Sequence, residues 1–196
     1  MKFLRLAALA MLASISFTTQ AFPIAAAGTE GNAVAVSGTG DIIATYQGNS
    51  AAYSNDLLLS MTVSGTGLDG NMLNDVFVFN NHTTPVGTTF NLGGFSVGTE
   101  LIFRLHVNNT GNDFYTGVAS RNPDGLAHAR VQSNWMPNES LVSFEDLYGT
   151  PEGINGYNDL SFSFTNTVGT PSVPEPASIA LTLLGLFGLY AQRRKA

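Results

Sequence analysis

The segment LSFSFT, residues 160–165, places an apolar side chain at every second position. Successive side chains of a β-strand point to opposite faces, so this spacing predicts a strand with one face in an apolar core. The segment LIFRLHV, residues 101–107, alternates in the same way. Neither segment has the apolar spacing of an amphipathic helix. Both therefore favour an antiparallel β-fold built from half-buried strands.

Similar short runs, rich in Val, Ile, Phe, Leu and Thr, recur along the chain and are mostly separated by Gly, Asn, Asp or Pro. These runs predict strands at Asp41–Tyr46, Leu57–Val63, Asp75–Asn80, Glu100–Val107, His128–Gln132, Leu141–Asp146 and Leu160–Thr165. The chain contains 13 Phe residues, which would supply much of a core. We expect one all-β domain over residues 22–165, an antiparallel β-sandwich or jelly roll of roughly seven to ten strands.

The N-terminus has the pattern of a secretory signal peptide. Lys2 and Arg5 precede an apolar run, and small residues follow up to Ala21. The run of about a dozen apolar residues is short for a hydrocarbon core of ~30 Å. We expect a signal peptide over residues 1–21, with cleavage after Ala27 as the alternative.

Once the termini are set aside, the chain is strongly acidic. Residues 22–173 contain three Arg, no Lys and 13 acidic residues, a formal charge of −10. A nucleic-acid binder needs clustered cations, so this charge excludes nucleic acid as a partner. It suits hard cations such as Ca²⁺, which take oxygen ligands. The absence of Cys rules out disulfides and thiol chemistry.

The most distinctive acidic segment is SFEDLYGTPEGINGYNDLSFSF, residues 143–164. If its two apolar ends pair as a hairpin, Glu145 and Asp146 lie close to Asn158 and Asp159. These four side chains are candidate Ca²⁺ ligands. Two alternatives stay open: the side chains cap backbone N–H groups at the loop mouth, or two carboxylates serve as glycosidase acid and nucleophile.

Two strings match catalytic patterns in an unsuitable context. GTGLDG, residues 65–70, fits a dinucleotide-binding loop, but a strand-like run follows in place of a helix. GFSVG, residues 94–98, fits a nucleophile elbow, with Asp124 and His128 in hydrolase order, but Ser96 is also followed by a strand pattern. The three His residues lack zinc-site spacing. We therefore expect no enzyme.

Three motifs resemble, in order, those of the domain of unknown function 4114: NPDGLAHARV (122–131), LVSFEDLYG (141–149) and GYNDLSFSF (156–164). The similarity extends over about residues 85–165. The resemblance implies a turn motif formed by Asn122, Asp124 and Gly125 with the nearby His128. It implies a fold and a site more than an activity.

The C-terminus resembles the PEP-CTERM sorting signal of Gram-negative bacteria. We expect a linker over residues 166–173 and the sorting signal over residues 174–196. The matching residues are Val173, Pro174, Glu175 and Pro176, and after an apolar run Arg193, Arg194 and Lys195. The resemblance implies export and recognition by exosortase, a membrane protease-transpeptidase, in species that make exopolysaccharide. The apolar run of fifteen residues spans about 22 Å as a helix, short for a permanent anchor, and the basic residues would stay cytoplasmic.

These observations predict an exported envelope or extracellular-matrix protein with a structural or binding role. It would contact the inner membrane transiently through its tail and then reach the cell surface or the exopolysaccharide matrix. Ca²⁺ is the expected cofactor, if the acidic hairpin binds one. The alternative is a secreted carbohydrate-active enzyme that uses the same hairpin.

Overall fold

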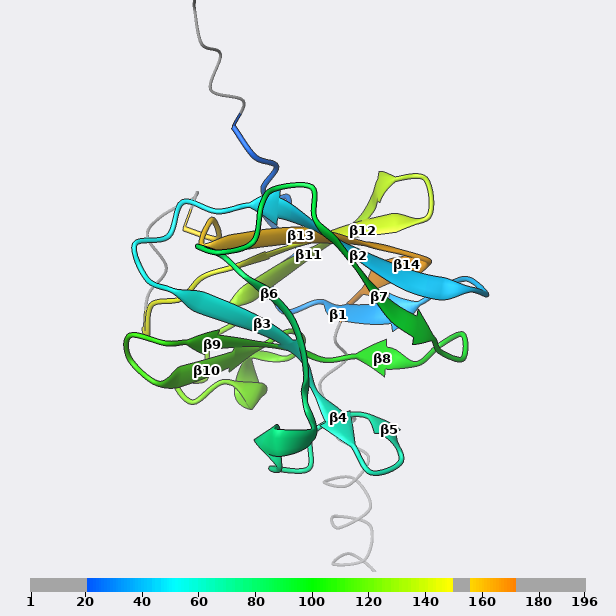
Figure 1. Ribbon diagram of the computed structural model, residues 1–196, viewed down its shortest axis with the longest axis horizontal. Helices are drawn as coiled ribbons and strands as arrows, with labels where there is room; N and C mark the ends of the chain where they lie inside the picture. The colour runs from blue at the N-terminus through cyan, green and yellow to red at the C-terminus, as the bar shows by residue number, and fades with distance from the viewer. Residues whose placement is uncertain (1–20, 150–155, 172–196) are drawn as a thin grey trace, which may run out of the picture.

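The computed structural model describes residues 21–149 and 156–171, and these form strands that pair antiparallel throughout (Figure 1). The expected all-β class is confirmed. The predicted signal peptide, apart from Ala21, and the sorting residues from Val173 onward lie outside the described residues. Among the described residues, no helix has the length and apolarity needed to cross a membrane.

Two sheets make up most of the domain (Figure 1). The five-stranded sheet has the order β11 (Ala129–Met136), β12 (Glu139–Phe144), β13 (Leu160–Thr165), β2 (Asp41–Gly48) and β7 (Thr89–Gly94). The four-stranded sheet has the order β10 (Asn112–Tyr115), β9 (Phe103–Val107), β3 (Asn55–Leu59) and β6 (Val76–Asn80).

Phenylalanine rings from both sheets meet in the core. Phe103 of β9 stacks on Phe164 of β13 with ring centroids 4.2 Å apart, and Phe162 lies 5.2 Å from Phe164 edge-on. Contacts of this kind add to the apolar area that each ring buries. The two sheets therefore form a sandwich, and the apolar residues of LSFSFT point into its core as predicted.

The other face of β13 is also buried, contrary to the expectation of a half-buried strand. Ser161 and Ser163 are 0% and 2% exposed. The N-terminal segment covers this part of the sheet, because the Ala25 N–H donates to Ser143 Oγ at 2.8 Å and Ser143 Oγ lies 2.8 Å from Ser161 Oγ. Small hydroxyl side chains that bond to each other and to this segment make burial on that face tolerable.

A third sheet has the order β14 (Thr167–Thr170), β1 (Ala33–Val36) and β8 (Glu100–Leu101). The predicted linker over residues 166–173 therefore contains a strand, because four of its eight residues form β14. Its pairing partner β1 lies more than 130 residues earlier in the chain, so local composition cannot reveal it.

Two predicted strands are each divided in the structure. Leu57–Val63 becomes β3 and β4 (Met61–Thr62), and Glu100–Val107 becomes β8 and β9. The breaks coincide, since the N–H of Ser60 donates to the carbonyl of Ile102 at 2.9 Å. There the chain passes from one sheet to another. The remaining short elements are β5 (Gly65–Thr66), η1 (Met72–Asn74) and η2 (Ala119–Arg121).

Candidate functional site

The pairing of β12 with β13 sets the position of the acidic hairpin. Phe144 lies opposite Leu160, and the N–H of Asp159 donates to the carbonyl of Phe144 at 3.0 Å. Glu145 and Asp146 leave β12 at the end where Asn158 and Asp159 enter β13. The structure thus brings the four predicted residues to one end of the five-stranded sheet.

Three of the four residues converge on one point. Glu145, Asp146 and Asp159, here called the acidic cluster, offer carboxylate oxygens that all lie within 4.8 Å of one another. The three residues are 0%, 4% and 9% exposed. Two oxygens bound to one Ca²⁺ at ~2.3–2.6 Å can be no more than about 5 Å apart. The separation and the hard-oxygen chemistry of the cluster therefore fit a divalent cation.

The same carboxylates also accept backbone hydrogen bonds, as the capping alternative expects. The N–H of Asp146 donates to Asp159 Oδ2 at 2.8 Å, and the N–H of Leu147 donates to Glu145 Oε1 at 3.1 Å. These bonds hold the side chains in fixed orientations. Capping and metal binding are compatible, because each carboxylate has two oxygens with several lone pairs.

Asn55, at the start of β3, is a further residue of this site and was not predicted from the sequence. It is fully buried, and its Nδ2 donates to Asp146 Oδ2 at 2.7 Å. Its Oδ1 is buried without a hydrogen-bond partner. A buried amide oxygen in this condition is costly, and amide oxygens are common Ca²⁺ ligands. Its sequence context, Asn-Asp before three Leu, gives no sign of this role.

Asn158 lies beside the acidic cluster on the wall of a cavity of about 260 Å³. The cavity is lined by the cluster together with Ser50, Ala52, Tyr53, Leu147 and Asn158. Such a volume holds several water molecules, which Ca²⁺ uses to complete a coordination number of six to eight. The site therefore has both protein ligands and room for solvent ligands.

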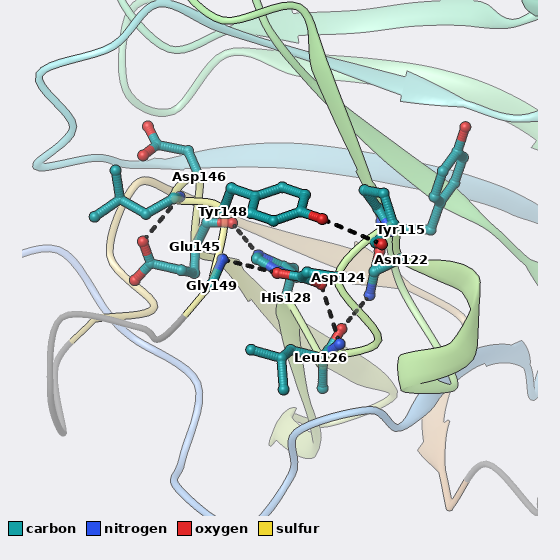
Figure 2. A network of polar contacts seen from close by, with 12 residues as sticks. Tyr115, Asn122, Asp124, Leu126, His128, Glu145, Asp146, Tyr148 and Gly149 are labelled. Carbon is teal, nitrogen blue, oxygen red and sulfur yellow. Dashed lines mark hydrogen bonds and ion pairs between the residues drawn. The ribbon is translucent and has the colours of Figure 1, made fainter.

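The turn motif forms a hydrogen-bonded network that adjoins the acidic hairpin (Figure 2). Asn122 accepts from the N–H of Tyr115 at 2.7 Å through Oδ1 and donates to the carbonyl of Leu126 at 2.6 Å through Nδ2. Gly125 has φ +73°, a conformation that favours glycine. Asn122 therefore fixes the turn on β10.

Asp124 joins this turn to the loop that follows β12. Its Oδ1 accepts from the N–H of Leu126 at 3.0 Å, and its Oδ2 accepts from the N–H of Gly149 at 2.9 Å. Burial disfavours the charged carboxylate, but these bonds and the one from His128 outweigh it and lower the pKa of Asp124 below its ordinary value. Asp124 is thus held as a buried anion in a structural role.

His128 lies between the turn and the acidic hairpin (Figure 2). Its ring stacks on Phe114 at 3.8 Å, Nε2 lies 2.8 Å from Asp124 Oδ2, and Nδ1 lies 3.1 Å from the carbonyl oxygen of Glu145. Both ring nitrogens thus face oxygen atoms, one on the turn and one on the hairpin. His128 thereby positions the backbone of Glu145.

These contacts argue against the accidental serine-hydrolase pattern. Ser96 is an exposed residue of the connection between β7 and β8. The two nitrogens of His128 face Asp124 and the backbone of Glu145, not a serine hydroxyl. The string at residues 65–70 contains β5 and leads only to the three-residue η1, which offers no phosphate-binding helix.

The three Arg residues of the domain are all in ion pairs. Arg104 lies 2.8 Å from Asp75 and 2.7 Å from Asp113, Arg121 lies 2.6 Å from Glu100, and Arg130 lies 2.6 Å from Glu30. The described residues therefore present no cluster of unpaired cations.

No curated protein and no solved structure matches this chain. The resemblance of residues 85–165 to the domain of unknown function 4114 has no support from these comparisons and stays a prediction. Residues 172–195 match the model of the PEP-CTERM protein-sorting motif. The chain therefore carries a C-terminal motif that implies export, processing at the membrane by exosortase and sorting to the cell surface.

Proposed function

We propose that this protein has a structural or binding role in the envelope or exopolysaccharide matrix of a Gram-negative bacterium, and that Ca²⁺ stabilises its β-sandwich. Glu145, Asp146 and Asp159 would hold the ion, with Asn55 and Asn158 close enough to take part. The sorting motif supports export and delivery to the cell surface. The acidic domain, with its Asn- and Gly-rich loops, suits a solvated exported protein.

The observation that carries the Ca²⁺ proposal is the convergence of three buried carboxylates within 4.8 Å. Like charges this close repel one another, and the repulsion grows as solvent is excluded. A divalent cation would replace this repulsion by attraction. The unpartnered Oδ1 of Asn55 supports the same conclusion independently.

The alternative, a secreted carbohydrate-active enzyme, has less support. A glycosidase needs two carboxylates that face one cleft, ~5–5.5 Å apart in retaining enzymes and ~6.5–9.5 Å apart in inverting ones. In this hairpin the oxygens meet within 4.8 Å, a geometry that favours an ion over a sugar between them. The described acidic residues that line the cavity are those of the cluster itself, whereas a glycosidase would need a second carboxylate facing the cluster across the cavity.

A thermal melt of the exported protein with Ca²⁺ and with EDTA tests the proposal. A ligand that binds only the folded state raises stability by RT ln(1 + [L]/Kd), about 2.7 kcal/mol at a hundredfold excess over Kd. For a domain of this size we expect Tm to rise by about 5–10 °C in millimolar Ca²⁺. An unchanged Tm would contradict the Ca²⁺ site.

The Asp159→Asn variant makes this test specific. The amide can still accept from the backbone of Asp146 but lacks the charge, so the Ca²⁺-dependent rise in Tm should disappear. Glu139→Gln is the matched control, because Glu139 begins β12 at the end away from the cluster. A control that also loses the response would point to an effect of net charge alone.

A further inference from the structure

Exposed apolar side chains are concentrated in one segment of the described chain. Half of the ten large apolar residues that are exposed in the described chain fall within residues 63–77. We call them the terminal patch: Val63, Leu68, Met72, Leu73 and Phe77. Val63 and Leu73 are 100% and 96% exposed. Scattered exposed apolar residues are normal, but a concentration of this kind marks an interaction surface.

Four of its residues lie on the β4–β5 hairpin, the loop after it and η1, and Phe77 lies in β6. The hairpin and η1 protrude at the lower edge of the view in Figure 1. The side chain of Asn71 accepts from the N–H of Leu73 at 3.2 Å, and Asp69 accepts from the N–H of Asn71 at 2.8 Å. These bonds fix the loop that presents Met72 and Leu73. The exposed positions belong to an ordered, hydrogen-bonded element.

The described chain leaves the fold close to this patch. At the end of β14, Thr170 lies opposite Ala33 of β1, and the next residue of β1 lies opposite Leu101 of β8. The hairpin is bonded to β8, since the hydroxyl of Thr66 donates to the carbonyl of Glu100 at 3.0 Å. Neighbouring strands are ~4.8 Å apart, so the hairpin begins about 15 Å from Thr170.

The length of the following segment limits how far the domain can be from the membrane. Only residues 171–176 separate Thr170 from the apolar run that begins at Ala177. Six residues reach at most about 20 Å. While the apolar run is in the bilayer, Thr170 lies within about 20 Å of the lipid surface, and the hairpin that carries the patch begins about 15 Å from Thr170.

The charge near the patch favours lipid as the occupant. Residues 61–77 contain two acids, and one of them, Asp75, is paired with Arg104 at 2.8 Å. This end of the molecule is therefore poor in net charge, although the domain as a whole is strongly acidic. A patch of this kind suits the interface of a zwitterionic bilayer.

We propose that the terminal patch seats the sandwich on the lipid surface while the sorting tail holds the chain in the membrane. The apolar side chains enter the boundary between headgroups and acyl chains. This contact orients the domain before processing, and it is lost when cleavage releases the tether. The inference goes beyond the proposed function and does not depend on Ca²⁺.

Depth-dependent fluorescence of the full-length chain in phosphatidylcholine vesicles tests this docking. Trp135→Phe removes the one native indole, and Leu73→Trp places a single probe in the patch. Val86→Trp is the control, since Val86 is 68% exposed but lies beyond the opposite end of β6. With lipids brominated in the acyl chains, emission from position 73 should fall to about half or less, as expected for a probe ~5–10 Å into the boundary.

Emission from position 86 should change little, and vesicle flotation checks that the tail is inserted. A chain that floats but shows equal quenching at positions 73 and 86 would overturn the docking and leave the sorting intact. A third outcome is that the probe at position 73 is shielded only at high protein density on the vesicle and is not quenched by brominated lipid. The patch would then contact a second copy of the chain, and the proposal would also be overturned. A chain that does not float would contradict membrane attachment and docking together.

Discussion

Asp124 is the residue at which the turn motif and the loop after β12 are held together. It accepts hydrogen bonds from Leu126, Gly149 and His128, and these lower its pKa below the unfolded value. Its contribution to stability is therefore complete above the unfolded pKa of about 4, and it is lost as the pH falls through the folded pKa. We expect acid to destabilise the domain partly through this residue.

The Asp124→Asn variant isolates this contribution. At neutral pH it should be less stable than the natural protein, by about 1–3 kcal/mol for a charged acceptor with several donors. The difference should shrink as the pH is lowered from 5 to 2, because the natural residue becomes protonated. Urea unfolding at a series of pH values measures it. A difference that stays constant over this range would contradict the lowered pKa.

The site could be predicted from the sequence only where its residues are local. Glu145 and Asp159 flank two runs of alternating apolar residues, so pairing those runs brings the carboxylates together. Asn55 lies about 90 residues earlier and reaches Asp146 only because of how the two sheets pack. Its environment depends on tertiary structure, which no short pattern contains.

At the scale of elements, β13 could be predicted from its local sequence and β14 could not. The bounds of β13 agree with the predicted Leu160–Thr165, because alternation and turn residues mark both of its ends. The next strand, TVGT, has one large apolar residue and is followed by Pro, a composition typical of linkers. Its strand conformation comes from pairing with β1 and not from local propensity.

Gly169 gives a way to test the packing of β14. A Cβ at this position would lie 2.6 Å from the carbonyl oxygen of Val131 in β11, closer than such atoms approach. Gly169→Ala must push β14 away from β11, and overpacking of this kind costs about 1–3 kcal/mol. We expect a Tm lower by several degrees.

Gly94→Ala is the control for that measurement. Gly94 ends β7, and a Cβ there would meet its nearest neighbour, Asp41 Oδ1, at an ordinary 3.7 Å. Its Tm should stay close to that of the natural protein. If Gly169→Ala is equally neutral, β14 is not packed against β11 as described, and the segment would be the linker that the composition suggests.

At the scale of the whole molecule, the sandwich and the tail have different tasks. The domain has no Lys, and its three Arg residues are in ion pairs. The other basic residues lie at positions 2, 5 and 193–195. Cations near a short apolar segment favour the cytoplasmic side, so this distribution leaves the acidic domain outside. Charge alone thus agrees with the orientation that the sorting motif implies.

The last prediction concerns the fate of that tail. The apolar run of fifteen residues, Ala177–Ala191, would span about 22 Å as a helix against a hydrocarbon core of ~30 Å. Such a segment holds the chain weakly, which suits temporary retention before cleavage near Pro174, Glu175 and Pro176. The intact mass of protein recovered from the cell surface should therefore lack residues 177–196 in a host that has exosortase. The same chain from a host without exosortase should keep these residues and fractionate with membranes. Surface protein that retains residues 177–196 would contradict processing and would make the tail an anchor, and the terminal patch would then be a permanent contact with lipid.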